Sequence, residues 1–153
     1  MRNLIILLFI AIFVLSGCGA GEVESLAGYM VIEGNLLRLD EVELITTEDS
    51  ERVAKLGLSE SDMPGGYCIY NEEENWQELK LTNKTTYTFV DYNMLFVKDK
   101  NSDRLYTTTK KEEFIQHLET SYTDSPPAQT VPFFVEIKDG KLISVTEEFR
   151  FTI

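Results

Sequence analysis

Apolar residues in this chain recur at every second position in short runs that turn residues separate. Phe133, Val135 and Ile137 form one such run, and the turn pair Asp139-Gly140 follows it. A period of two places one face of a strand in a core and the other face in solvent. Repeated runs of this kind predict short strands joined mostly by hairpins, and therefore mostly antiparallel pairing.

The same pattern predicts strands over most of the chain and helices in two places. The other expected strands cover residues 29–32, 36–39, 42–44, 67–70, 79–81, 87–89 and 104–109. A first helix opens over residues 46–51 with a Thr cap and stops at Gly57, and a second covers residues 110–120. Runs of strands with few helices predict an α+β fold, mostly β. We expect a curved antiparallel sheet or small open barrel with one or two short helices.

Two positions need a local adjustment of register. Val42 and Leu44 alternate at the opposite parity from Leu37 and Leu39, which predicts a bulge near Asp40-Glu41. In the last hairpin, a three-residue loop over 138–140 would pair Val135 with Ile143 and Phe133 with Val145. That loop needs a left-handed residue at Gly140. Phe149, Phe151 and Ile153 would continue the inward row.

The first residues resemble an export signal that ends in a lipidation site. One positive charge, Arg2, precedes an unbroken apolar run over residues 4–15, which is too short for the roughly 20 residues of a membrane-spanning helix. The run ends in Leu15-Ser16-Gly17-Cys18, which resembles the lipobox of bacterial lipoproteins. We expect cleavage after residue 17 and a diacylglyceryl group on Cys18, with palmitate among its acyl chains. Two acyl chains give stable membrane anchoring.

This interpretation divides the chain into three parts. Residues 1–17 are the expected signal peptide, residues 18–26 a flexible tether of small and polar residues, and residues 27–153 a single α+β domain. The expected location is the extracytoplasmic face of a cell membrane, in the cell envelope. Residue 19, directly after Cys18, is Gly and not the Asp that marks inner-membrane retention in Gram-negative cells. The expected membrane is therefore a Gram-positive cell membrane or a Gram-negative outer membrane.

Composition limits the classes of partner. The chain has 26 Asp and Glu against 14 Lys and Arg, a formal net charge of −12. Such a domain is repelled by nucleic acid, so we expect none as a partner. After lipidation of Cys18 the lone thiol is Cys68, so no disulfide can form within one molecule.

The chain contains one His and two Cys, so few residues could form a catalytic or metal site. Cys68 lies within an apolar stretch, where a small buried hydrophobe is expected, and His117 lies on a charged helix, where it is expected to be solvated. A catalytic dyad of these two is therefore disfavoured. Two acidic loops, 72–74 and 99–103, lack the spacing of a calcium loop. We predict no catalytic residues, no metal site and no cofactor.

Two aromatic residues are the best candidates for contacts with a partner. Trp76 follows an acidic turn, and Phe134 faces away from the row that Phe133 begins. Exposed aromatic residues often anchor binding interfaces.

Two groups of motifs resemble a family of proteins. The first begins Thr47-x-Asp49-x-Glu51-Arg52 and continues through Asp62-Met63-Pro64 to Ile69-Tyr70-Asn71. The second comprises Pro132-Phe133-x-Val135, Asp139-Gly140-Lys141 and Val145-Thr146-Glu147. Together they resemble small, uncharacterised extracytoplasmic lipoproteins of Gram-positive bacteria. The resemblance covers most of residues 28–150 and implies the outer face of a Gram-positive cell membrane, but it brings no activity.

Three functions remain open at this point. The first is a membrane-anchored, non-catalytic binding or interaction module for an unknown envelope protein or ligand. The second is a small-ligand or cation-binding lipoprotein, which a pocket with several aromatics and few charges would favour. The third is a cell-wall hydrolase, which would need two carboxylates facing each other across a cleft.

Overall fold

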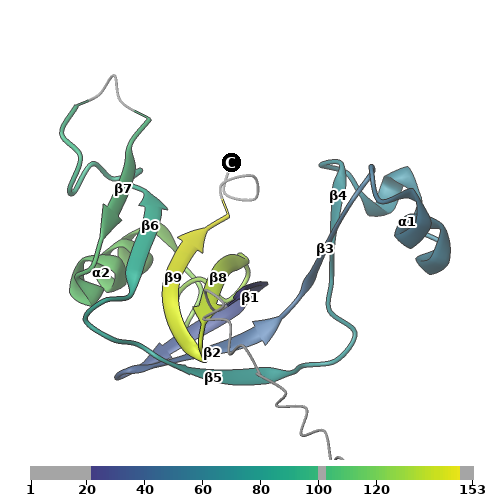
Figure 1. Ribbon diagram of the computed structural model, residues 1–153. Coiled ribbons are helices and arrows are strands. Elements are labelled where there is room, and N and C mark those ends of the chain that lie inside the picture. Colours follow the sequence, from purple (N-terminus) through teal and green to yellow (C-terminus); the bar gives the residue numbers. More distant parts are fainter. Residues whose placement is uncertain (1–21, 100–102, 149–153) are drawn as a thin grey trace, which may run out of the picture.

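A strongly bent sheet of seven strands forms the body of the molecule (Figure 1). The structure is a computed structural model that describes residues 22–99 and 103–148. The strand order is β5-β2-β1-β8-β9-β6-β7. The strands are β1 (Val23–Glu33), β2 (Leu36–Glu41), β5 (Trp76–Lys80), β6 (Thr86–Val90), β7 (Leu105–Thr108), β8 (Phe133–Lys138) and β9 (Lys141–Glu147). The sheet does not close, so the prediction of a mostly β, α+β fold with a curved open sheet is confirmed.

Pairing is antiparallel at every neighbouring pair of the large sheet except one. β6 runs parallel to β9, with Tyr87 opposite Val145. Parallel neighbours cannot be joined by a tight hairpin. Here β7, helix α2 (Lys111–Ser121) and β8 all lie between β6 and β9 along the chain.

The core lies between one face of the sheet and α2. Phe114 and Leu118 of the helix are buried against Tyr87 and Phe89 of β6 and Phe133 of β8. The rings of Tyr87 and Phe114 stack with centroids 4.8 Å apart. The observed helix lies within one residue of the predicted range of 110–120. Burying several large aromatic rings is the main stabilising contribution that this part of the chain can make.

Strand β1 begins earlier than the sequence predicts. Residues 23–26 were expected in a flexible tether, but Val23 pairs with Lys138 and Leu26 with Val135. Because β1 pairs with β8 from Val23 onward, the folded domain begins at Val23 and not at residue 27. Any tether between Cys18 and the domain is correspondingly shorter than 18–26.

A separate arm leaves the sheet after β2 (Figure 1). We use "arm" for residues 43–70, which contain β3 (Glu43–Thr46), α1 (Ser50–Leu56), the short 3-10 helix η1 (Glu60–Asp62) and β4 (Tyr67–Tyr70). β3 and β4 form their own two-stranded sheet. The predicted bulge near Asp40-Glu41 is wrong, because β2 pairs with β1 in an unbroken register up to Glu41. The change of parity at Val42 marks the point where one strand ends and the chain enters a second sheet.

Helix α1 also begins later than predicted. It starts at Ser50 with Asp49 as the N-cap residue, so the Thr cap is wrong. The Asp49 carboxylate instead accepts hydrogen bonds from the backbone N–H of Thr46, at 2.8 Å, and from its hydroxyl, at 2.9 Å. These bonds lower the pKa of Asp49, the backbone bond most. The predicted stop is confirmed, because Gly57 caps the helix with a left-handed φ of 66°.

The last hairpin has a different register from the predicted one. Its loop contains two residues, since Lys138 pairs with Lys141, and Val135 lies opposite Val145 rather than Ile143. A bulge at Ile143 restores the alternation beyond the turn, and Leu142 replaces Ile143 as the buried residue. Asp139 and Gly140 have φ of 51° and 70°, as a type I′ turn requires. The two-residue turn uses the positive φ of Asp139 and Gly140, and the nearby bulge keeps the apolar side chains of both strands on the buried face.

Several predictions fall outside the described residues. These are the signal peptide, Cys18, and the inward row of Phe149, Phe151 and Ile153. Within residues 22–99 and 103–148, no helix is long and apolar enough to cross a membrane.

Candidate binding site

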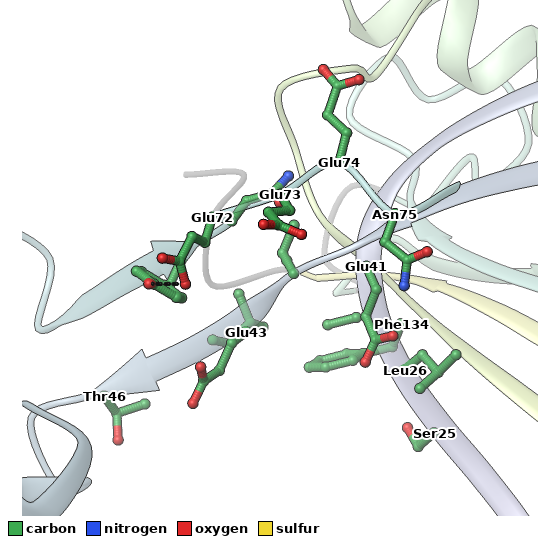
Figure 2. A pocket seen from close by; sticks show the side chains of 15 residues that line it. Ser25, Leu26, Glu41, Glu43, Thr46, Glu72, Glu73, Glu74, Asn75 and Phe134 are labelled. Atoms are coloured by element: carbon green, nitrogen blue, oxygen red, sulfur yellow. Dashed lines mark hydrogen bonds between the residues drawn. The ribbon is translucent and has the colours of Figure 1, made fainter. Parts of the chain in front are cut away.

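A pocket of about 780 Å³ lies where the arm leaves the sheet (Figure 2). We call it the arm pocket. Four segments line it: part of β1, the chain from the end of β2 through β3, the end of β4 with the acidic loop that follows it, and β8. Its lining residues are Ser25, Leu26, Ala27, Glu41, Val42, Glu43, Leu44, Thr46, Tyr70, Asn71, Glu72, Glu73, Glu74, Asn75 and Phe134. The pocket exists because the chain changes sheets at Val42.

A buried carboxylate holds the acidic loop in place. Asp40 is 4 % exposed on β2. It accepts hydrogen bonds from the Asn71 side-chain amide at 2.8 Å and from the Asn75 backbone N–H at 2.7 Å. Hydrogen bonds to a charged group are stronger than neutral ones. Both ends of the loop that carries Glu72, Glu73 and Glu74 are therefore tied to the sheet.

The other wall of the arm pocket is tied to α1. Arg52 of the helix makes a bidentate pair with Glu43, with Nε 2.8 Å from Oε1 and Nη2 2.6 Å from Oε2. The guanidinium also lies over the ring of Tyr70, 5.3 Å from its centroid. The Tyr70 hydroxyl donates to Glu72 at 2.7 Å, and this bond is the main reason why the pKa of Tyr70 is raised. Arg52 thus neutralises one of the pocket's carboxylates.

The arm pocket remains strongly acidic after that pairing. Five of its described lining residues are glutamates, and none is a lysine or arginine. All five are exposed. Across the described ranges, no three His, Cys, Asp or Glu side chains gather closely enough to hold a metal ion. The carboxylates are spread over the pocket, which suits an extended cationic ligand better than a single metal ion.

The two predicted contact residues lie in and beside the arm pocket. Phe134 is half-buried and forms part of its wall (Figure 2). Trp76 is half-buried at the start of β5, with the Arg38 guanidinium 5.1 Å from its ring centroid. The Trp76 indole N–H donates to the pocket residue Glu74 at 3.4 Å. The structure therefore places both residues near one site, although 58 positions separate them in the sequence.

The prediction that His117 is solvated is wrong. Its side chain is 1 % exposed and stacks on Phe89, with centroids 4.1 Å apart. Nε2 lies 3.1 Å from Glu147 Oε1, and Nδ1 lies 3.2 Å from the Ser121 hydroxyl. Glu147 also accepts from the Tyr122 hydroxyl. No local sequence signal identifies this network, because its members come from α2 and β9.

Ser121, His117 and Glu147 are connected in the same sequence of contacts as the serine, histidine and acid of a hydrolase triad. Their burial, however, indicates a role in stabilising the fold. A catalytic imidazole must reach a substrate, whereas His117 is enclosed by Phe89, Tyr122 and the carboxylate of Glu147. The Glu147 carboxylate receives a further hydrogen bond from the Val90 backbone N–H at 2.9 Å. The network joins α2, β6 and β9 and satisfies buried polar groups.

Asp91 performs a similar role at the end of β6. Burial raises the pKa of its carboxyl group, but hydrogen bonds from the backbone N–H groups of Val97, Phe96 and Leu95 outweigh this effect and lower it. The charged form of Asp91 therefore folds the apolar segment 94–97 back onto the sheet.

Cys68 is half-buried in β4, less deeply than the sequence predicts. β4 and α2 lie at opposite ends of the molecule in Figure 1. The disfavoured dyad of Cys68 and His117 therefore does not form.

No protein-family model, no curated protein and no solved structure matches this chain.

Proposed function

We propose that this protein is a membrane-anchored, non-catalytic binding module of the cell envelope, and that its arm pocket receives a positively charged segment of an envelope protein. A lipid on Cys18 would hold it at the extracytoplasmic face of the membrane. The proposal for the anchor rests on the lipobox and the apolar run before it.

The acidity of the arm pocket is the observation that carries the proposed ligand class. Five exposed glutamates surround a volume of about 780 Å³, and Arg52 pairs with only one of them. Complementary charge accelerates encounter and selects partners of the opposite sign. Phe134 on the β8 side and Leu44 on the arm side add apolar surface to the pocket, which suits the long aliphatic stems of Lys and Arg side chains.

The two alternatives fit the pocket less well. A small apolar ligand would be favoured by several aromatic side chains and few charges, yet among the described lining residues only Tyr70 and Phe134 are aromatic. Glycoside hydrolysis needs one carboxyl group in an environment that keeps it protonated, and all five glutamates are exposed. A cationic ligand agrees with both observations.

Titration calorimetry with a lysine-rich and arginine-rich decapeptide tests the proposed ligand class. The triple variant Glu72→Gln, Glu73→Gln, Glu74→Gln should weaken binding by about tenfold and flatten its salt dependence. The matched control replaces three exposed glutamates outside the pocket, Glu60, Glu78 and Glu119, by Gln. The control should bind as the parent does. Equal loss in both variants, or no binding to the parent, would contradict the proposal.

Membrane fractionation tests the proposed anchor separately. Cys18→Ser should leave the protein as an unprocessed precursor or release it from membranes, because the lipobox then has no thiol for the lipid. Cys68→Ser is the control and should fractionate like the parent. Processing and membrane binding of Cys18→Ser that equal those of the parent would show that Cys18 is not the anchor.

A further inference from the structure

The first part of β1 has an edge that no neighbouring strand covers and that faces the arm pocket. β1 pairs with β8 over residues 23–28 and with β2 over residues 28–33. Over residues 23–26, no strand of the described chain pairs with the edge that β2 occupies further along. Ser25 and Leu26 from this stretch line the arm pocket, so the free edge forms part of its wall (Figure 2).

The edge is free because β1 and the arm diverge. β2 continues into β3 through Val42, whose backbone N–H donates to the Ala27 carbonyl at 2.8 Å. Beyond that bond β3 pairs with β4, whereas β1 pairs with β8, so the two strands separate. Figure 2 shows Ser25 of β1 and Thr46 of β3 on opposite sides of the pocket. The arm pocket is therefore a wedge between two diverging strands.

The alternation of the backbone along β1 identifies the groups that this edge offers. Neighbouring residues of a paired strand direct their N–H and C=O groups to opposite sides. The Ala27 carbonyl points to the side of the wedge, so Ser25 and Val23 direct their N–H and C=O groups there as well. Glu24 and Leu26 direct theirs toward β8. A free edge of this kind is a template for pairing with another strand.

The facing edge of β3 offers fewer groups. The Thr47 N–H donates to the Gly66 carbonyl at 3.1 Å, so by the same alternation Thr46 and Leu44 face the wedge. The Thr46 N–H, however, already donates to the Asp49 carboxylate at 2.8 Å. β1 is also paired with β8 behind its free edge, whereas β3 belongs to a sheet of two strands. A strand that enters the wedge therefore finds its better template in β1.

The charges near the free edge favour a basic strand over a second copy of this chain. Glu22 and Glu24 flank Val23, and residues 22–26 contain no Lys, Arg or Pro. Edge strands are commonly protected from pairing by Lys or Pro. Two acidic edges would repel each other, whereas a basic strand would be attracted. The five glutamates of the arm pocket add to this preference.

We propose that the positively charged segment binds as an added β-strand along the free edge of β1, with its backbone paired to Val23 and Ser25. This inference rests on the proposed function of the arm pocket and adds the binding mode to it. Backbone hydrogen bonds supply affinity in this mode, and side chains that point to alternate faces supply specificity. Lys and Arg side chains of the added strand lie within the wedge, beside the glutamates of β3 and of the acidic loop.

Alternate N-methylation of the lysine-rich and arginine-rich decapeptide tests the backbone pairing. One isomer is methylated at every odd position and the other at every even position, so each loses the N–H donors of one strand edge. Titration calorimetry with the full chain should show about tenfold weaker binding for one isomer and unchanged affinity for the other. Equal affinity of the two isomers would overturn strand addition and leave the cationic ligand class intact. No binding of the unmethylated peptide would overturn both.

Ser25→Pro tests the same edge on the protein side, because it removes an N–H that points into the wedge and takes no part in the pairing with β8. It should weaken binding of the unmethylated peptide by about tenfold. Ser25→Ala keeps the N–H, and this matched control should bind like the parent. Equal affinity of the two variants would overturn the proposed pairing.

Hydrogen exchange of the unaltered chain, followed by NMR, gives a measurement that does not depend on a variant. The N–H groups of Val23 and Ser25 should exchange rapidly in the free chain and about tenfold more slowly when the peptide is bound. Those of Glu24 and Leu26 should change less, since they already face β8. Slow exchange at Val23 and Ser25 before the peptide is added would show that the chain itself or a second copy covers the edge. That result, or no slowing on binding, would overturn the proposal.

Discussion

The sheet with α2 and the arm with α1 are stabilised by different kinds of contact. In the first region, aromatic rings pack in a dry core around the buried His117–Glu147 pair. In the arm, α1 has no buried residue, the buried apolar side chains are those of Ile45 and Met63, and Arg52 makes surface contacts with Glu43 and Tyr70. Burial contributes far more stability than exposed ion pairs. We infer that the sheet region sets the global stability and that the arm opens at lower cost.

This difference has a consequence for binding. The arm pocket lies between a rigid wall, formed by β1 and β8, and a wall formed by the arm. Elements with few buried contacts undergo local opening most readily. A partner that bridges the two walls would therefore stabilise the arm more than the sheet. Four substitutions probe this comparison.

Glu147→Ala should have the largest effect. It leaves His117, the Tyr122 hydroxyl and the Val90 N–H without their shared acceptor in a buried site. Leaving these buried groups unpaired costs about 3–5 kcal/mol in total. Urea denaturation measures this loss, and the exposed Glu119→Ala on α2 is the control. A loss below 1 kcal/mol would show that the network does not stabilise the sheet region.

Asp91→Asn should cost about 1.5–3 kcal/mol at neutral pH, because three backbone N–H groups lose a charged acceptor. The folded pKa of Asp91 lies below its unfolded value. Its contribution is therefore present above the unfolded pKa, near 3.9, and is lost as pH falls through the folded pKa. Urea denaturation from pH 7 to pH 2 should show parent and variant converging at the acid end. A pH-independent difference would contradict the role of the charge.

Gly140→Val should destabilise the protein by about 1–3 kcal/mol, because φ at this position is 70° and a β-branched residue is strained there. The added Cβ meets no atom within 4 Å, so the expected effect comes from backbone strain. Gly140→Asn is the control and should be milder, since Asn tolerates the left-handed region. Thermal melts of both variants provide the measurement. Equal stability of the two would show that residue 140 is not left-handed.

Arg52→Ala should have the smallest effect on global stability, because its pair with Glu43 is exposed to solvent. Its effect should be local. Hydrogen exchange should accelerate at β3 and β4 and remain unchanged at β8 and β9. Lys111→Ala, which removes a comparable surface contact from α2, is the control and should leave exchange in the arm unchanged. Uniform acceleration across both regions would show that the arm and the sheet unfold as one unit.

Local features of the chain were predictable because they depend on neighbouring residues. Alternating apolar residues predict most of the strands, Gly57 the end of α1, and the apolar face of 110–120 the second helix. The mostly β fold class follows from these elements together. Gly140 has a positive φ, as expected both for the predicted three-residue loop and for the observed two-residue turn.

The remaining features were decided by contacts between distant segments. The bulge at Ile143 exists because the tight turn and the buried row must both be satisfied, whereas the predicted three-residue loop would keep the row on one face without a bulge. His117 lies on a helix whose neighbours in sequence are charged, yet Glu147, thirty positions away, gives it a buried partner. The arm pocket combines residues from β1, β3, β8 and the loop after β4. Sequence by itself determined which segments form strands and helices, because that choice depends on local periodicity. Only the tertiary structure decided which polar groups are buried and where a pocket opens, because both depend on how those segments pack.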